Sequence, residues 1–295
     1  MFLIERTGNN GVEVIKQNCF VLEEGCQEME YLTFPSFEKS GLVEHLITTR
    51  LGGVSTGEFS TMNLSFSRGD KEENVLENYR RIGRILGCGI EDMVSSHQTH
   101  TVNIRHVTAA DRGKGIKTPR DYEDIDGLIT NEQGIALVTY YADCVPLFLL
   151  DPVHRAIGLA HSGWKGTVNR MGEHVVEAMK TAFGSKPQEM IAAVGPSICK
   201  WCYEVSEDVA EQFMQLFQGK AEDLCVVEKG KAPGKYQLDL WLANRLILEE
   251  AGISEENISV TDICTCHNSE YLFSHRASNG RRGNMGAFLM LRKSS

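Results

Sequence analysis

The sequence has no apolar run long enough to cross a membrane. Its longest apolar runs, Ile135–Tyr141 and Val145–Leu150, fall far short of the ~20 residues that a membrane-spanning helix needs. Basic residues are also scarce, with 30 Lys and Arg against 40 Asp and Glu, and the formal net charge is -10. This sign is unsuited to a protein that works by neutralising phosphate backbones. We therefore expect a soluble protein that binds neither a membrane nor a nucleic acid.

The sequence also lacks a secretory signal and a disulfide framework. Residues Met1–Arg6 contain no basic start followed by a long apolar segment and a small-residue cleavage site. The nine cysteines are an odd number scattered over 295 residues, which does not favour disulfide scaffolding. We expect a cytoplasmic protein whose cysteines are thiols, a few with metal or catalytic roles and the rest buried.

No linker, low-complexity segment or internal repeat interrupts the chain, so we expect one domain covering residues 1–295. Apolar residues at helical spacing predict four amphipathic helices; the first opens with an Asp70–Glu73 capping pair and the third follows a Ser206 cap. The expected helices are 70–86, 168–183, 206–217 and 241–251, and the expected strands are 46–49, 135–141, 145–150, 156–160, 190–194, 258–263 and 287–291.

Several of these strands are apolar throughout, which is typical of strands covered on both faces. The segments 135–150 and 156–161 are too close in sequence for a helical crossover, so part of the sheet must be antiparallel. The sequence therefore predicts a mixed α+β architecture in which helices sandwich the sheets. It disfavours a pure doubly wound fold.

Reactive side chains gather where predicted strands end, in the segments 96–100, 140–146 and 160–166. His100, Cys144 and His161 offer one thiolate and two imidazoles, a set that suits zinc and leaves a fourth tetrahedral position for water. The same residues also fit a metal-free pair, with Cys144 as nucleophile and His161 as its base. The two hypotheses compete, because a zinc-bound cysteine is a poor free nucleophile.

Two neighbouring side chains have less specific roles. For His97 we favour a supporting or surface role over ligation. Asp143 is a candidate general acid or base, or a partner that orients a ligand imidazole. On the sequence alone, an ordinary carboxylate at a strand end explains Asp143 somewhat better.

Glycine-containing turns with cations are candidate anion sites. Arg50 lies in the turn 48–55, and Lys165 lies in the turn 162–166 just before a predicted helix. The C-terminal run 273–283 adds Arg276 and further cations. Phosphate is the expected ligand, although neither turn is a Walker loop or a dinucleotide fingerprint.

Two cysteine-rich segments do not predict a site. Cys199 and Cys202 have redox spacing, but they follow a Gly-Pro turn instead of opening a thioredoxin-type helix. Cys264, Cys266 and His267 have no second ligand pair nearby in the sequence. We expect thiols buried at a strand end there, without a metal.

Taken in order, several segments resemble the motifs of the laccase-domain family, whose members are called polyphenol oxidase, purine nucleoside phosphorylase or peptidoglycan-editing factor. The resemblance runs from about residue 45 to 290, nearly the whole chain. The matching segments are 48–55 (TTRLGGVS), 63–64 (NL), 98–100 (QTH), 126–128 (DGL), 142–144 (ADC), 160–166 (AHSGWKG), 195–196 (GP), 202–205 (CYEV) and 264–265 (CT).

The resemblance implies an αββα-like layered fold, shared with cysteine hydrolases and toxin deamidases, and one zinc ion held by His100, Cys144 and His161. It also implies phosphorolysis of adenosine, inosine and methylthioadenosine, together with deamination of adenosine. Small-molecule nucleosides and phosphate are then the expected partners.

On this hypothesis the catalytic residues are Asp143, Cys144 and His161, with Asp143 moving protons. Phosphate would be held by Arg50, Lys165 and Arg276, and the nucleoside would contact Asn63 and Gln98. The C-terminal loop departs from the family pattern, because segments 274–277 and 283–284 lack the second arginine of each expected pair. Arg281 and Arg282 are candidates to compensate.

Two other functions stay open. A Cys144–His161 hydrolase or amidase on cell-wall precursors would survive chelation and be abolished by alkylation of Cys144. A copper-dependent polyphenol oxidase is the third hypothesis. The nine histidines include no His-x-His pair, so a three-copper cluster could not readily be built.

Overall fold

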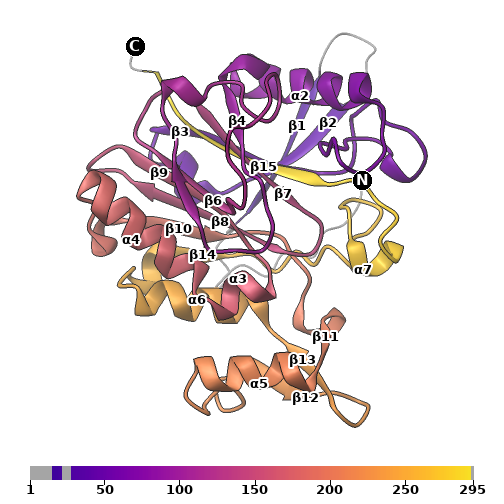
Figure 1. Cartoon of the computed structure of the whole chain (residues 1–295), viewed down its shortest axis with the longest axis vertical. Helices are drawn as coiled ribbons and strands as arrows, with labels where there is room; N and C mark the ends of the chain where they lie inside the picture. The colour runs from indigo at the N-terminus through magenta and orange to yellow at the C-terminus, as the bar shows by residue number, and fades with distance from the viewer. Residues whose placement is uncertain (1–14, 22–27, 294–295) are drawn as a thin grey trace.

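The computed structural model describes residues 15–21 and 28–293. Two mixed six-stranded sheets stack face to face, and helices cover their outer faces (Figure 1). The first sheet has the order β1 (Lys16–Val21), β2 (Glu28–Thr33), β3 (Val43–Thr48), β15 (Met285–Leu291), β7 (Ala136–Tyr141) and β4 (Met93–Ser95). The second has the order β14 (Ile258–Val260), β10 (Ile191–Val194), β8 (Val145–Asp151), β9 (Ala156–Ser162), β6 (Gly127–Thr130) and β5 (Ile104–His106).

The alternating side chains of the strands divide the interior into layers. In β15, Ala287 and Leu289 face the core between the sheets, whereas Phe288 and Met290 face the opposite side. The strands β8 and β9 form an antiparallel hairpin, while β4 runs parallel to β7. The predicted α+β sandwich with an antiparallel part is therefore confirmed.

Amphipathic helices supply the two outer layers. The helix α2 (Glu72–Leu86) packs Val75, Tyr79 and Ile82 against the first sheet, and α4 (Met171–Phe183) and α6 (Leu240–Glu250) cover the second. The remaining helices are α1 (Pro35–Glu38), α3 (Trp164–Val168), α5 (Glu207–Leu216) and α7 (His275–Ser278). Among the described residues, no helix is long and apolar enough to span a membrane.

A small third sheet was not predicted. It consists of β11 (Glu204–Ser206), β13 (Lys235–Leu238) and β12 (Val227–Lys229), and together with α5 it lies at the bottom of Figure 1. Its strands are three or four residues long and only partly apolar, so they carry little periodic signal.

Two local predictions were wrong. The first helix begins at Glu72 without a capping box, because Asp70 accepts hydrogen bonds from the Lys71 amide and the Asn74 side chain instead. The helix predicted over 168–183 is two helices, α3 and α4, separated by Arg170 in the left-handed conformation. Ser206 does precede α5, but its side chain makes no cap hydrogen bond.

The chain passes from one sheet to the other at one end of the sandwich, and these crossings position the reactive loops. The chain leaves β7 in the first sheet and enters β8 in the second through residues 142–144. It crosses in the same direction between β4 and β5 through residues 96–103. Loops that are about 40 residues apart in sequence therefore come together at this end.

A buried histidine in β3 makes stability depend on pH. The Nε2 atom of His45 accepts a hydrogen bond of 2.8 Å from the Phe34 amide, and the ring packs against Phe34, Phe37 and Phe148. Burial lowers the pKa of His45 to about 3, and the positive charge of Arg292 acts in the same direction.

Because the pKa of His45 is lower in the folded state than in the unfolded state, its contribution to stability is present above pH ~6.5 and is lost as the pH falls toward 3. The loss amounts to about 2 kcal/mol between pH 6.5 and pH 5. We expect His45→Gln, which keeps a hydrogen-bond acceptor but does not titrate, to remove this pH-dependent part of the free energy of unfolding. Urea unfolding of both proteins at the two pH values checks it, and an unchanged pH dependence in the variant would refute the assignment.

Candidate metal centre and active site

Three side chains from different loops converge at the end of the sandwich where the chain crosses between the sheets. His100 follows β4, Cys144 lies between β7 and β8, and His161 belongs to the end of β9. Their ligand atoms all lie within 4.8 Å of one another. The three residues singled out from the sequence are therefore brought together as a candidate metal site. Left-handed backbone conformations at His100, with φ 67°, and at Asp143, with φ 89°, form the sharp turns that direct this arrangement.

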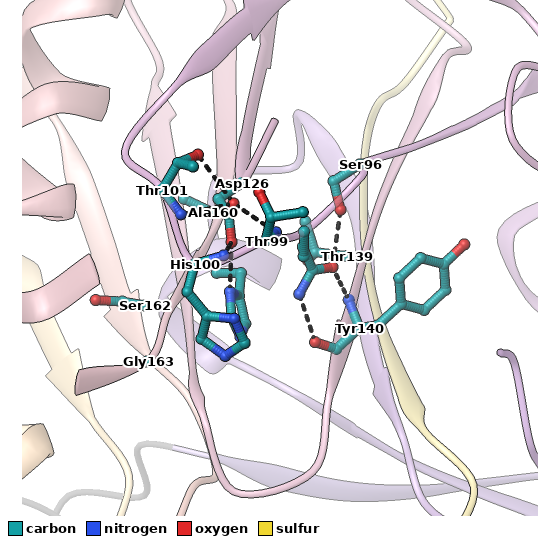
Figure 2. Close-up of polar contacts among 12 residues, drawn as sticks. Ser96, Thr99, His100, Thr101, Asp126, Thr139, Tyr140, Ala160, Ser162 and Gly163 are labelled. Carbon is teal, nitrogen blue, oxygen red and sulfur yellow. Dashed lines mark hydrogen bonds and ion pairs between the residues drawn. The ribbon is translucent and has the colours of Figure 1, made fainter. Parts of the chain in front are cut away.

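A buried carboxylate organises two of the candidate ligands. Asp126 accepts hydrogen bonds from the backbone amides of Thr99, His100 and Thr101, from the Thr101 hydroxyl and from Nδ1 of His161 at 2.8 Å. Figure 2 shows Asp126 beside the segment that carries Thr99 and Thr101. Burial alone would raise the pKa of Asp126, but the hydrogen bonds from His161 and the amides outweigh it and leave the pKa lowered.

An ionised carboxylate can only accept, so Nδ1 of His161 carries the hydrogen and Nε2 is left as the ligand atom. This carboxylate–histidine arrangement is common behind metal-binding imidazoles. The role of Asp126 was missed at the level of sequence. Its signal was the Asp126-Gly127-Leu128 segment, which matched the family pattern without indicating a contact.

Cys144 and His161 influence each other's protonation. Burial would raise the pKa of Cys144, but the positive charge of His161 and a hydrogen bond from His100 lower it to about 6. Burial would lower the pKa of His161, but the Cys144 thiolate and Asp126 raise it to about 9. Without a metal the pair favours thiolate and imidazolium, which also suits a cysteine nucleophile.

Gly163 lies against the candidate ligands. A Cβ atom at this position would stand 3.0 Å from Sγ of Cys144 and 3.1 Å from a ring carbon of His100. Both contacts are tighter than ordinary van der Waals separation. The absence of a side chain at Gly163 thus keeps space beside both ligands.

A cavity of about 370 Å³ opens onto the three candidate ligands. His97, Gln98 and Tyr140 contribute to its wall. The amide of Gln98 pairs with the backbone of Tyr140, accepting from its N–H at 2.7 Å and donating to its carbonyl at 2.8 Å. Figure 2 shows Tyr140 and Ser96 close together, and Gln98 accepts a hydrogen bond from the Ser96 hydroxyl as well. His97 lines the cavity but lies outside the ligand group, in agreement with a supporting role.

Three arginines line the same cavity: Arg68, Arg120 and Arg282. Burial and the neighbouring charge of Arg68 lower the pKa of Arg282 to about 10, so it remains a cation at neutral pH. The buried Nε of Arg282 and the buried Oδ1 of Asn284 have no hydrogen-bond partner.

The cations expected from the sequence lie elsewhere. Arg50 donates to the carbonyls of Ser60 and Ser269 and faces a different, smaller pocket. Lys165 is exposed on α3 and does not line the 370 Å³ cavity. Arg276 donates to the carbonyls of Cys202 and Glu204. Asn63 is completely buried and binds Ser65, Asp70 and the Asn284 amide.

Asp143 lies outside the wall of the 370 Å³ cavity, and its carboxylate holds two loops. One carboxylate oxygen accepts from the Thr265 hydroxyl at 2.6 Å, and the other accepts from the Arg276 amide at 2.7 Å. These contacts favour holding two loops in place over transferring protons. Arg68, by contrast, belongs to a segment without any motif, and no local pattern indicated that it lines the cavity.

The fold and site define a class of protein, a layered α+β sandwich with a cysteine and two histidines at a cavity between its loops. The family model described as "Multi-copper polyphenol oxidoreductase laccase" matches residues 44–292, so the chain belongs to this family. The expected laccase-domain membership is thereby confirmed.

Similar proteins include one from Bacillus subtilis called "Purine nucleoside phosphorylase YlmD", which is 38% identical over 250 residues, 83% of this chain and 87% of that one. A protein from an unknown prokaryotic organism, called "Adenosine deaminase RL5", is 32% identical over 84% of this chain and 94% of its own. The solved structure of the Bacillus licheniformis hypothetical protein YfiH superposes with a TM-score of 0.83 at 32% identity, covering 89% of this chain and 96% of the other.

Proposed function

We propose that this protein is a zinc-dependent purine nucleoside phosphorylase that also deaminates adenosine. The observation that carries the proposal is the cavity in which three metal-ligating atoms face a cluster of arginines. The names of the similar proteins supply the substrate class, purine nucleosides. Adenosine, inosine and methylthioadenosine are the proposed substrates, with phosphate as the second one.

The candidate ligands fit a zinc ion. One thiolate and two imidazoles leave one of four tetrahedral positions open, as in catalytic zinc sites. Copper also accepts one cysteine and two histidines when a weak axial ligand is present, so metal analysis has to distinguish the two metals. Zinc bound here would supply Lewis acidity beside the substrate.

The chain's own residues supply the remaining functions. Asp126 holds the imidazole of His161 and the backbone of His100 in place. Arg68 and Arg282 present positive charge to phosphate, whose oxygen forms a bond to C1′ of the ribose while the bond from C1′ to the purine breaks. The purine nitrogen that leaves takes up the proton that the phosphate loses, directly or through solvent. For deamination, a water oxygen adds to C6 of adenine and ammonia leaves. The cavity wall around Gln98 and Tyr140 limits the space available to the nucleoside.

Replacing Arg282 by glutamine is expected to raise the KM for phosphate at least ~10-fold, because a charged hydrogen bond to phosphate contributes about 1.5–3 kcal/mol. The KM for adenosine should change much less. Initial rates at varied phosphate and varied adenosine concentrations measure both constants. Lys165→Gln serves as the comparison, since Lys165 lies outside the cavity. An equal effect of the two substitutions would contradict this assignment.

The proposed reaction is tested by chromatography of the products formed from adenosine and phosphate. We expect adenine with ribose 1-phosphate, and inosine from deamination. Both activities should disappear after chelation and return with zinc, and metal analysis of the purified protein distinguishes zinc from copper. If adenosine is unchanged by zinc-loaded protein, the proposal is wrong.

The lowered pKa of Cys144 favours one alternative, a Cys144–His161 hydrolase acting on cell-wall precursors. This enzyme would keep its activity after chelation and lose it when Cys144 is alkylated. The same chelation experiment therefore separates the two functions.

We further propose that the chain acts as a single domain, since the family match spans most of it. A cytoplasmic location fits the eight described cysteines, none of which forms a disulfide.

A further inference from the structure

A second group of metal-ligating side chains lies outside the proposed active site. Cys199, Cys202, Cys264 and His267 place one ligand atom each within 4.8 Å of all the others. The two pairs, a Cys-x-x-Cys and a Cys-x-x-His, are more than 60 residues apart in sequence. The sequence analysis expected only buried thiols here because it treated each pair alone.

Backbone pairing brings the two segments together. Ser197 and Cys264 form a parallel bridge, in which the Thr265 amide donates to the Ser197 carbonyl at 3.0 Å. Cys199 and Cys264 are 6% and 3% exposed, whereas His267 lies at the surface. The cluster is thus preformed by the fold, and its histidine provides access from solvent.

The hydrogen bonds within the cluster suit a thiolate ligand. The Sγ atom of Cys264 accepts from the backbone amides of Cys199 at 3.3 Å and His267 at 3.5 Å. Such amides stabilise negative charge on sulfur. The Sγ atom of Cys199 lies 3.8 Å from Nδ1 of His267. Bonds of about 2.0–2.3 Å to one tetrahedral zinc ion place ligand atoms somewhat under 4 Å apart.

We propose that Cys199, Cys202, Cys264 and His267 bind a second zinc ion with a structural role. Three thiolates and one imidazole complete a tetrahedron, leaving no open position for water or substrate. Binding releases the thiol protons to solvent. A closed set of four protein ligands distinguishes this site from the three-ligand group at the cavity.

The second site connects to the first through the loops that it joins. Thr265, next to Cys264, donates to the carboxylate of Asp143, the neighbour of Cys144. Arg276 donates to the carbonyl of Cys202 and, through its amide, to Asp143. Zinc at the second site therefore fixes the two segments that hold the Asp143 turn.

Metal analysis of purified variants tests the proposal without any assay of activity. We expect two zinc ions per chain in the parent protein. The Cys199→Ser/Cys264→Ser variant should retain one, and His100→Ala should also retain one. Cys225→Ser, which removes an exposed thiol elsewhere, should retain two. A parent protein with one zinc ion that is lost in His100→Ala would overturn the second site while leaving the first intact.

Alkylation of the parent protein covers the case in which the double variant does not fold. Cys202, which is only partly buried, should be protected in the native protein and become reactive when a chelator is added, whereas the exposed Cys225 should react at the same rate throughout. Mass spectrometry of peptides reports each cysteine separately. A disulfide among Cys199, Cys202 and Cys264, or protection unaffected by the chelator, would refute zinc binding there.

Discussion

Replacing His100 by alanine is expected to remove the metal from the cavity site and to lower the turnover of adenosine by ~10³-fold or more. A metal ion contributes several kcal/mol of transition-state stabilisation, and each 1.4 kcal/mol is about tenfold in rate. His100 is the informative ligand because the metal-free Cys144–His161 pair does not need it as a base. Metal content per chain and steady-state rates with adenosine and phosphate measure the two effects.

A matched control for this variant is His174→Ala, which removes an exposed histidine from α4. It should retain both the parent's metal content and its rate. If His100→Ala loses its metal but keeps its activity, the metal is not part of the reaction. The cysteine nucleophile would then become the better hypothesis.

Replacing Asp126 by asparagine is expected to weaken zinc binding at the cavity by about 10- to 100-fold, the usual cost of losing a carboxylate behind a ligand imidazole. The amide cannot accept all five hydrogen bonds that the carboxylate accepts from residues 99–101 and His161. The freed imidazole can also adopt the other tautomer, which removes Nε2 as a ligand. Competition with a chromogenic chelator measures the affinity.

Stability alone cannot test this positioning role, since an unpaired buried donor costs about 1–3 kcal/mol at any site. Asp151 provides a close comparison. It is also completely buried, and it accepts from Nδ1 of His154 at 2.7 Å and from the amides of Val153 and His154. Asp151→Asn should lower the unfolding temperature without changing zinc affinity. Equal affinities in both variants would show that Asp126 only supports the fold.

Zinc bound at the second site affects the metal measurements on both the His100 and the Asp126 variants. Metal analysis counts all bound zinc, so the loss at the cavity appears as a change of one ion per chain and not as complete loss. The variants at His100 and Asp126 leave Cys199, Cys202, Cys264 and His267 unchanged. A residual zinc ion in His100→Ala, which should lose the cavity metal, would therefore support the structural site.

Local sequence patterns were sufficient for the long elements of the fold. Apolar residues at helical spacing identified α2, α5 and α6, and continuous apolar runs identified β7, β8 and β9 within one or two residues. The short strands β4, β5 and β11 were missed, because three residues carry too little periodicity to distinguish them from loops.

The sequence by itself determined the layered α+β class and the residue types of the first candidate metal site, since both depend on local pattern and chemical identity. Only the tertiary structure decided which polar groups meet. It placed the carboxylate of Asp126 against Nδ1 of His161. It also put Arg68 and Arg282 at the cavity instead of Arg50 and Lys165. Finally, it brought Cys199 close to Cys264, without a bond between them. Contacts between loops depend on how distant strands pair and where the chain crosses between sheets, and no spacing within a single segment specifies that.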